Sequence, residues 1–448
     1  MTQKLKALLR EPVPAAKATL AEPDFSNNYA KPGESESPGT TAESPGVDQE
    51  CDARLESLPA EIRGQILADA DLQVLHALIR ASPVFYRQYL LDRKFFLTAS
   101  LDVTLGIVAI DAHAVQRLEH GGSNTAHHVT KVLENWRMNL RHRSSWCLKP
   151  ADALTEDEVT SMISFYLRTI SPMARHLVCW ASDGPAKQII NLKTHPLSTT
   201  ELQRFIRAVY RFQLLCYVTS VLSSNIATDN AKSLIYNLEP WEAEELYSFY
   251  QSSEGVYDKI FDRISGDVHP ENPRFDDQSR PPTPDGAFEF DNSWTRRNFA
   301  EGTTLRGGLS LLSTVLSDIG ANDQERLVNI MQRSIVSSYI PISGHEGLFG
   351  QSKQQQRRQE EPTIGDSLTE ERAPCPFCGD NQSVPPLAWT LIWGGTYSNL
   401  YGWYTGDELR QWAYVFWDGV RLRKYGGDEF LAKQWEQCWW EDPRETLF

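Results

Sequence analysis

Residues 55–67 read LESLPAEIRGQIL, residues 71–79 read DLQVLHALI, and residues 82–91 read SPVFYRQYLL. Each of these blocks begins in the manner of a helix. Pro59 suits the first position of a helix, where its missing N–H would have no partner in any case. Asp71 is a natural cap for the second helix, and Ser82 followed by Pro83 is a cap followed by a first-turn proline. The three blocks therefore predict three short helices between residues 55 and 97.

The apolar residues of these blocks recur at helical spacing. They are Leu58, Ile62, Ile66, Leu72, Leu75, Ile79, Phe85, Tyr89 and Leu90. This number is enough for a three-helix cluster. A unit of about forty residues has only a small core, so we expect a partner or the rest of the chain to cover part of its apolar surface.

The order of these residues resembles the F-box, in particular the divergent F-box-like version common in fungal proteins. The matching pattern is Leu58-Pro59-x-Glu61-Ile62-x-x-x-Ile66-Leu67, then Asp71-Leu72-x-x-Leu75, then Ser82-Pro83-Val84-Phe85. It covers about a tenth of the chain. The link from Leu67 to Leu72 lacks a proline, and Phe85 and Tyr86 stand where many F-boxes have a tryptophan.

The resemblance implies a surface that docks on the Skp adaptor of a Skp–cullin–F-box ubiquitin ligase, while the remainder of the chain selects an unknown protein substrate. The residues that it places at the partner surface are Leu58, Pro59, Ile62, Ile66, Leu67 and Leu72. Leu75, Leu78 and Phe85 would hold the helices together. The alternative is that these apolar residues pack within one large helical domain that has a structural or interaction role and no part in a ligase.

The composition predicts a folded intracellular protein with more than one domain. The chain has 448 residues, of which 41% are hydrophobic, and a net charge of -15 from 44 basic and 59 acidic residues. This acidity opposes binding to nucleic acid, because phosphate contacts need a basic surface. The N-terminal residues Met1 to Lys6 do not begin an apolar stretch of signal-peptide length, and runs such as 214–222 are too short for a bilayer, so we expect no membrane partner. Seven scattered cysteines suit a reducing compartment, either cytoplasm or nucleus.

Shifts in composition divide the chain into seven predicted parts. These are a disordered tail (1–50), the F-box-like helical module (51–100), a larger helical domain (101–265), a proline-rich linker or loop (266–303), helices that continue the helical domain (304–343), a polar loop (344–386) and a tryptophan-rich segment (387–448). The sequence has no internal repeat, which argues against a solenoid.

Capping boxes and apolar periodicity predict further helices in the middle of the chain. Thr155 with Glu158, and Ser198 with Glu201, are spaced so that each side chain can satisfy a backbone donor of a first helical turn. Other helices are expected at 126–141, 240–264, 305–319 and 325–339. Residues 387–404 differ from these predicted helices because they are rich in Trp, Tyr and Gly. We interpret them as a short hairpin or an irregular aromatic loop.

The C-terminal part holds eight of the thirteen tryptophans from Trp389 onward. A capping box at Thr405 and Glu408 predicts a helix with one apolar side. That side comprises Leu409, Trp412, Ala413, Phe416, Trp417 and Val420. We interpret the segment as core that packs against earlier helices, since buried aromatic rings are ordinarily packing. An aromatic ligand-binding surface is the alternative.

The pair Cys375 and Cys378 has the spacing of half a zinc site, but no second close pair of ligands accompanies it. We therefore prefer an inert loop pair over zinc binding, and zinc over redox chemistry, which would need a strand before the pair and a helix after it. His127 and His128 would point to different faces of their helix, so we expect surface residues. The sequence predicts no metal and no cofactor.

The sequence shows no phosphate-binding glycine loop, no nucleophile elbow and no His-Glu-x-x-His pattern. We therefore assign no catalytic residue and expect a protein that is not an enzyme. An enzyme without a recognisable motif is the rival class, because catalytic groups can be distant in sequence. A deep pocket with converging titratable groups would favour it.

Overall fold

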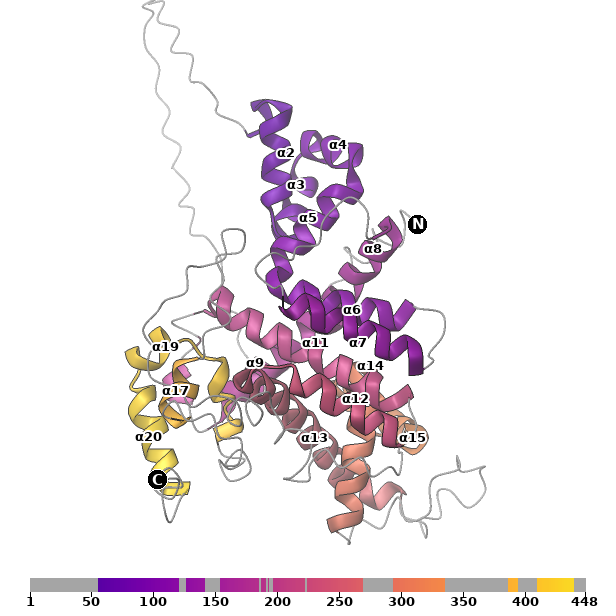
Figure 1. Ribbon diagram of the computed structural model, residues 1–448, viewed down its shortest axis with the longest axis vertical. Coiled ribbons are helices and arrows are strands. Elements are labelled where there is room, and N and C mark those ends of the chain that lie inside the picture. Colours follow the sequence, from indigo (N-terminus) through magenta and orange to yellow (C-terminus); the bar gives the residue numbers. More distant parts are fainter. Residues whose placement is uncertain are drawn as a thin grey trace, which may run out of the picture.

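The computed structural model describes residues 55–120, 126–141, 154–184, 187–190, 192, 196–221, 224–268, 293–334, 386–393 and 409–438. Within these ranges every regular element is a helix and no β-strand occurs, which confirms the predicted mostly helical class. Figure 1 shows the N-terminal helices standing on a larger helical body, with the C-terminal helices beside that body. The predicted tail and the pair Cys375 and Cys378 lie outside the described residues.

Two of the three predicted N-terminal helices, α3 and α4, begin where the sequence predicts. A 3-10 turn, η1 (Leu55–Ser57), precedes α2 (Ala60–Asp69), α3 (Leu72–Ala81) and α4 (Pro83–Leu91). Asp71 Oδ1 accepts hydrogen bonds from the N–H groups of Gln73 and Val74, each at 2.8 Å, and so caps α3. Ser82 Oγ accepts from the Val84 N–H at 3.2 Å at the start of α4. Pro59 is the N-cap of α2 rather than its first helical residue, so α2 begins one residue later than predicted.

A fourth helix joins these three to the body, and it crosses the predicted module boundary at residue 100. This helix, α5 (Arg93–Leu105), packs against α2 and α3 on one side and α8 on the other. Thr104 Oγ1 accepts a hydrogen bond from the Leu72 N–H at 2.9 Å, and Arg93 pairs with Glu156 of α8 at 2.8 Å. The N-terminal helices are therefore a four-helix unit continuous with the body.

Helix α5 runs through η2 (Gly106–Val108) into α6 (Ala109–His120). This 28-residue stretch, Arg93–His120, is long and apolar enough to cross a membrane, so the expectation that all apolar runs are too short was wrong. Of its most apolar window, 61% is buried against other parts of the protein, as in a core helix. Helices α5, η2 and α6 are each short, and the stretch reaches 28 residues only because they follow one another without a gap.

The body is built around α11 (Thr199–Val221). Packed around α11 are α6, α9 (Ser171–Asp183), α12 (Ser224–Tyr236), α13 (Pro240–Val268) and α14 (Ser293–Ala321). Two more helices, α7 (Ala126–Arg141) and α15 (Gln324–Ser334), pack on α6 and α14, while α8 (Glu156–Phe165) reaches α9 through a π-helical turn, η4 (Tyr166–Ile170). Phe205, Val209 and Phe212 of α11 are fully buried at its centre.

Both capping boxes predicted in the middle of the chain form. The Thr155 N–H donates to Glu158 Oε2 at 2.7 Å, and the Glu158 N–H donates to Thr155 Oγ1 at 3.2 Å. Ser198 and Glu201 make the same reciprocal pair, with both bonds at 3.0 Å. Both ends of the predicted linker 266–303 are helical, because α13 extends to Val268 and α14 begins at Ser293. Residues 269–292 lie outside the described ranges, as do 335–339 of the last predicted middle helix.

The predicted structure of the C-terminal segment was wrong in two places. Residues 387–393 form a helix, α17 (Leu387–Trp393), where we expected a hairpin or irregular loop. The continuous helix expected beyond Glu408 is broken by Ala413, whose φ of 52° is left-handed, and continues as η8 (Tyr414–Phe416), α19 (Gly419–Lys424) and α20 (Gly427–Cys438). Val420, predicted on the apolar side, is 80% exposed.

Beyond the break, Asp418 has an extended backbone immediately before α19. The expected packing against earlier helices does occur. The ring of Phe416 stacks on Phe205 of α11 with centroids 4.4 Å apart, and Trp417 meets the same ring edge-on at 5.4 Å. Tertiary packing has therefore overridden the local helical pattern. Thr405 and Glu408, the predicted cap, lie outside the described residues.

Candidate functional site

The six residues predicted at a partner surface fall into three groups. Pro59 and Ile62 are exposed, Ile62 by 42%. Leu58 and Ile66 are half-buried. Leu67 and Leu72 are buried, with exposures of 0% and 7%, and pack with the residues that we expected to hold the helices together. Both face inward from the end of α2 and the start of α3. Their place in a partner contact stays a prediction.

Arg63 fixes the turn that carries Pro59, although the sequence pattern did not single it out. Its guanidinium donates to the carbonyl of Glu56 at 3.1 Å, to the carbonyl of Leu58, and to Gln88 Oε1 of α4 at 3.0 Å. Gln88 in turn donates to the carbonyl of Ala60. These hydrogen bonds connect the start of α2 to α4. The backbone on both sides of Pro59 is therefore fixed in position.

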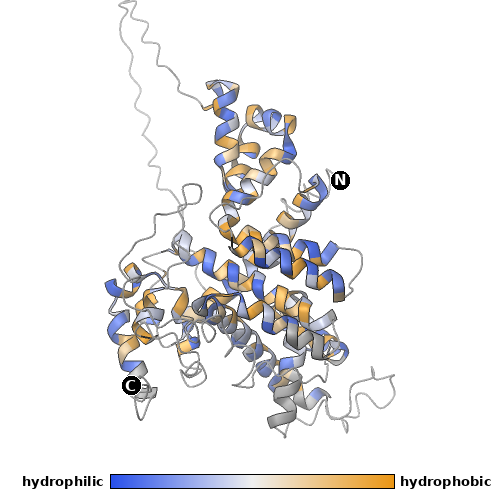
Figure 2. Cartoon of the chain, in the orientation of Figure 1, coloured by the Kyte–Doolittle hydropathy of each residue, from blue (hydrophilic) through white to orange (hydrophobic). Residues whose placement is uncertain are grey.

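Exposed apolar side chains gather on the N-terminal helices. Of the eleven large apolar residues exposed in the part of the chain that the structure describes, seven lie between residues 55 and 105. They are Leu55, Ile62, Val74, Leu90, Leu91, Phe95 and Val103. Figure 2 shows apolar positions along these outer helices as well as in the body. Scattered exposed apolar residues are normal, so the notable feature is that most of those described lie in this one small unit.

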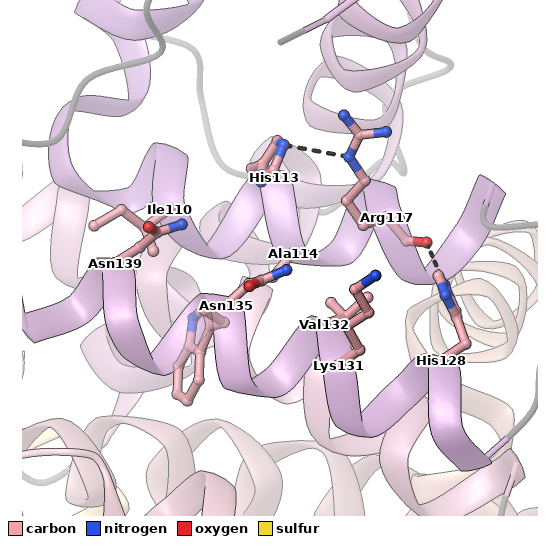
Figure 3. Close-up of a pocket in the computed structure, with 10 residues that line it drawn as sticks. Ile110, His113, Ala114, Arg117, His128, Lys131, Val132, Asn135 and Asn139 are labelled. Carbon is pink, nitrogen blue, oxygen red and sulfur yellow. Dashed lines mark hydrogen bonds between the residues drawn. The ribbon is translucent and has the colours of Figure 1, made fainter.

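A pocket of about 230 Å³ lies between α6 and α7 (Figure 3). Its polar lining consists of His113, Arg117, His128, Lys131, Asn135 and Asn139, and its apolar lining includes Ile110, Ala114 and Val132. None of the described residues that line it is acidic. Sequence reasoning missed this site because its residues come from two helices, and no spacing within either helix predicts it.

Hydrogen bonds set the tautomers of the two pocket histidines. His128 Nε2 lies 3.0 Å from the carbonyl oxygen of Arg117, which can only accept, so this nitrogen carries a proton. The half-buried His128 thus bridges the two helices, whereas its neighbour His127 is exposed as predicted. His113 Nε2 accepts from Arg117 Nε at 3.4 Å, so that nitrogen is unprotonated.

The charge of Arg117 is partly balanced by Glu158 of α8, at 3.0 Å. Burial, with the nearby Arg117 cation, holds the pKa of His113 below its ordinary value of 6.5, although Glu158 opposes this. His113 is accordingly neutral at pH 7. The pocket therefore presents two side-chain cations, Arg117 and Lys131, beside imidazole rings and the amide donors of Asn135 and Asn139.

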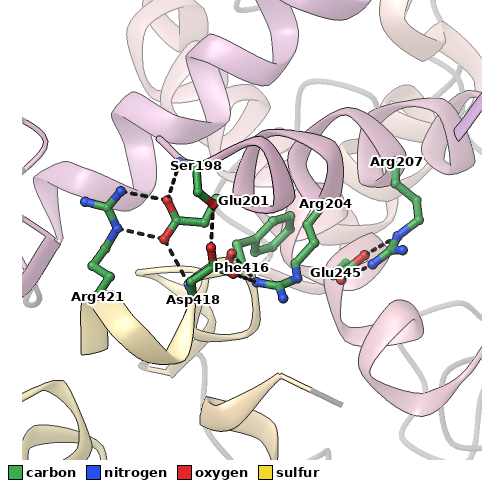
Figure 4. Close-up of polar contacts among 8 residues, drawn as sticks. All are labelled: Ser198, Glu201, Arg204, Arg207, Glu245, Phe416, Asp418 and Arg421. Atoms are coloured by element: carbon green, nitrogen blue, oxygen red, sulfur yellow. Dashed lines mark hydrogen bonds and ion pairs between the residues drawn. The ribbon is translucent and has the colours of Figure 1, made fainter. Parts of the chain in front are cut away.

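Buried ion pairs tie the C-terminal segment to α11 (Figure 4). Arg421 donates to both carboxylate oxygens of Glu201, at 2.7 and 2.6 Å, and to the carbonyls of Ile190 and Pro196 at 2.8 Å. The Glu201 carboxylate also accepts from the Asp418 N–H at 3.0 Å. Burial alone would raise the pKa of Glu201, but these hydrogen bonds and the Arg421 charge lower it.

The Asp418 carboxylate completes this cluster. It accepts from Arg204 Nη1 at 3.0 Å and from the Ser198 hydroxyl. Arg204 also donates to the Phe416 carbonyl at 3.0 Å. The cap of α11 and the start of α19 thus share one set of hydrogen bonds.

A second group of buried charges joins α11 to α13 and α6. Arg207 donates to both oxygens of Glu245, at 2.8 and 2.6 Å, and Arg211 pairs with Glu242 at 3.2 Å and with Asp111 at 3.3 Å. Burial alone would lower the pKa of Arg207, but Glu245 and Glu242 more than offset it, and the pKa is raised. Because these carboxylates are engaged by arginines and do not line the pocket, the group is suited to holding helices rather than to catalysis.

The described residues contain no group of three His, Cys, Asp or Glu side chains placed to hold a metal ion. Cys179 and Cys216 are free thiols, one exposed and the other buried. Comparison with known proteins finds no protein-family model, no curated protein and no solved structure that matches this chain. The functional conclusions therefore rest on the fold, the exposed apolar residues of the N-terminal helices and the pocket.

Proposed function

We propose that this protein is an F-box-like, adaptor-binding subunit of a ubiquitin ligase, and that its remaining helices hold a protein substrate. The observation that supports the proposal best is the concentration of exposed apolar side chains on the N-terminal helices, described above. Water disfavours such a surface, and a partner that covers it gains about 25 cal/mol for each Å² of apolar area removed from water. In the cell, the proposal places the chain in the cytoplasm or the nucleus.

The contact that we propose centres on Pro59 and Ile62, with the half-buried Leu58 and Ile66 at its edge. Arg63 and Gln88 hold this turn in place, so little conformational freedom would be lost when a partner binds. A small number of anchor side chains in a protein interface usually carries most of the binding free energy. Ile62 is the best single anchor to test, because it is exposed and lies on a helix that packs against α4 and α5.

The test measures binding of the full chain to a purified Skp-type adaptor by isothermal titration calorimetry. Ile62→Asp should weaken binding at least about tenfold, since a charge would be buried in an apolar contact. Val420→Asp is the matched control, because Val420 is a more exposed apolar residue far along the chain. Circular dichroism should show an unchanged helix content for both variants.

No binding by the wild-type chain at about 10 µM adaptor would refute the ligase role. Equal binding by wild type and a folded Ile62→Asp variant would refute the proposed contact. If the adaptor does not bind but Ile62→Asp abolishes capture of another protein, the chain is a helical interaction protein without a ligase role.

A further inference from the structure

The pocket between α6 and α7 gathers hydrogen-bond donors in an acidic protein. Acidic residues outnumber basic ones 59 to 44 over the whole chain, yet none of the described lining residues is acidic. Figure 3 shows Lys131 and Asn135 extending from α7 toward α6, with His113 on the facing helix. A concave site lined by cations and amide donors raises the local concentration of anions.

The volume of the pocket limits its ligand. At about 230 Å³ it is below the range of about 300–1,000 Å³ that holds drug-sized molecules. It is several times larger than the ~30 Å³ that a water molecule occupies in the liquid. Ile110, Ala114 and Val132 supply apolar lining beside the donors. These dimensions suit a small molecule with an anionic head and a short apolar body.

We propose that this pocket binds a small organic anion, with the head at Lys131 and Asn135 and the apolar body against Ala114 and Val132. Lys131 is the principal cation of the site, because Arg117 already shares its charge with Glu158. A lysine ammonium binds phosphate or carboxylate oxygens as a compact point charge without requiring one geometry. The site is separate from the surface of α2, so it stands independently of the adaptor-binding function.

The experiment titrates phenyl phosphate and benzoate into the full chain by isothermal titration calorimetry at pH 7.5, with phenol as the neutral probe and inorganic phosphate as the probe without an apolar body. Lys131→Met keeps most of the side-chain stem and removes the charge. It should weaken binding of the tighter anion roughly tenfold, the usual effect of losing one charge-assisted hydrogen bond. Asn135→Asp, a near-isosteric change at an exposed position, should weaken binding as much by repulsion.

Lys433→Met is the matched control, because Lys433 is an exposed lysine of α20 remote from the pocket. It should leave the affinity unchanged. Tighter binding of phenyl phosphate than of benzoate would assign a phosphate head, and the reverse order a carboxylate head.

The proposal is overturned if neither aromatic anion binds at about 10 mM, or if phenol binds as tightly as the anions. It also fails if inorganic phosphate binds as tightly as both aromatic anions, or if Lys131→Met and Lys433→Met have equal effects.

Discussion

At the scale of single residues, the most consequential contacts are buried pairs between distant parts of the chain. Glu201 and Arg421 are 220 positions apart in sequence, and their side chains are 1% and 6% exposed. Desolvation of two charges offsets much of their attraction, so such a pair adds little net stability over an apolar pair. Its main effect is on which packing arrangement is favoured, because any arrangement that separates the two side chains leaves a buried charge without a partner. The pair therefore fixes where the C-terminal segment docks.

Arg421→Met should lower the free energy of unfolding by about 3–5 kcal/mol, since it leaves the Glu201 carboxylate buried without its cation. Urea unfolding followed by circular dichroism measures this change. Lys187→Met is the matched control: it breaks the exposed pair with Asp183, whose side chains are 71% and 73% exposed, and should cost less than about 0.5 kcal/mol. Similar losses in the two variants would contradict the role given to burial.

Two histidines should make the protein less stable in mild acid. Burial lowers the pKa of His176, with a further contribution from Lys259, and burial together with Arg117 lowers that of His113. Both titrate at higher pH in the unfolded chain, near 6.5. The unfolded state therefore binds more protons as pH falls through 6.5, and stability is lost until the folded pKa values are reached.

Urea unfolding midpoints at pH 7.5 and pH 5.5 measure this loss. His176→Gln should retain more of its pH 7.5 stability at pH 5.5 than wild type does, because the variant has no proton to gain at this position. The midpoint of each protein at pH 7.5 serves as its own reference. An unchanged pH dependence in the variant would contradict the contribution of His176.

At the scale of elements, α14 shows how one residue shapes a helix. Gly308 lies inside α14 with φ of 56° and ψ of -161°, a conformation essentially restricted to glycine, and it kinks the helix there. The Leu309 N–H that follows the kink is satisfied by Gln213 Oε1 of α11 at 3.0 Å. The helix predicted at 305–319 runs through Gly308, so the sequence pattern did not reveal the kink, and the contact with α11 satisfies the Leu309 N–H that the kink exposes.

Gly308→Ala should lower the free energy of unfolding by about 1–3 kcal/mol, because alanine is strained in this backbone conformation. Its new Cβ would also lie 3.3 Å from Gln213 Oε1. Gly255→Ala, inside α13 with open space around the added methyl, should instead raise stability by about 0.5–1 kcal/mol. Thermal unfolding of both variants checks the opposite signs, and a stabilising Gly308→Ala would rule out backbone strain at the kink.

At the scale of the whole molecule, the C-terminal segment and the body share one core. Arg410 donates to both oxygens of Glu244 in α13, at 2.9 and 2.8 Å, and Trp389 meets Trp241 edge-on with centroids 6.5 Å apart. The segment therefore covers apolar rings and neutralises carboxylates that belong to α11 and α13. Its removal would expose both.

A chain that ends at Asn381 should be much less stable than the full protein, with a lower thermal midpoint or aggregation, because Glu201 and Glu244 would lose their arginines. Deletion of residues 1–50, predicted to be disordered, is the control and should leave the midpoint close to that of the full chain. If the C-terminal truncation remained soluble and equally stable, the segment would be an independent module.

The sequence by itself determined the helical class and where several helices begin. Asp71, Ser82, Thr155 and Ser198 cap their helices as predicted, because a cap bonds backbone groups only two or three residues away and needs no distant partner. It also marked the N-terminal helices as a unit rich in apolar residues.

Only the tertiary structure decided which of those apolar residues face inward. Leu67 is buried and Ile62 exposed because α4 and α5 cover one side of α2, which no local pattern reveals. The break at Ala413, the pairing of Glu201 with Arg421 and the basic pocket arise in the same way. Each depends on segments that are far apart in the chain and meet only in the folded protein. The contacts that stabilise it therefore cannot be predicted from any single stretch of sequence.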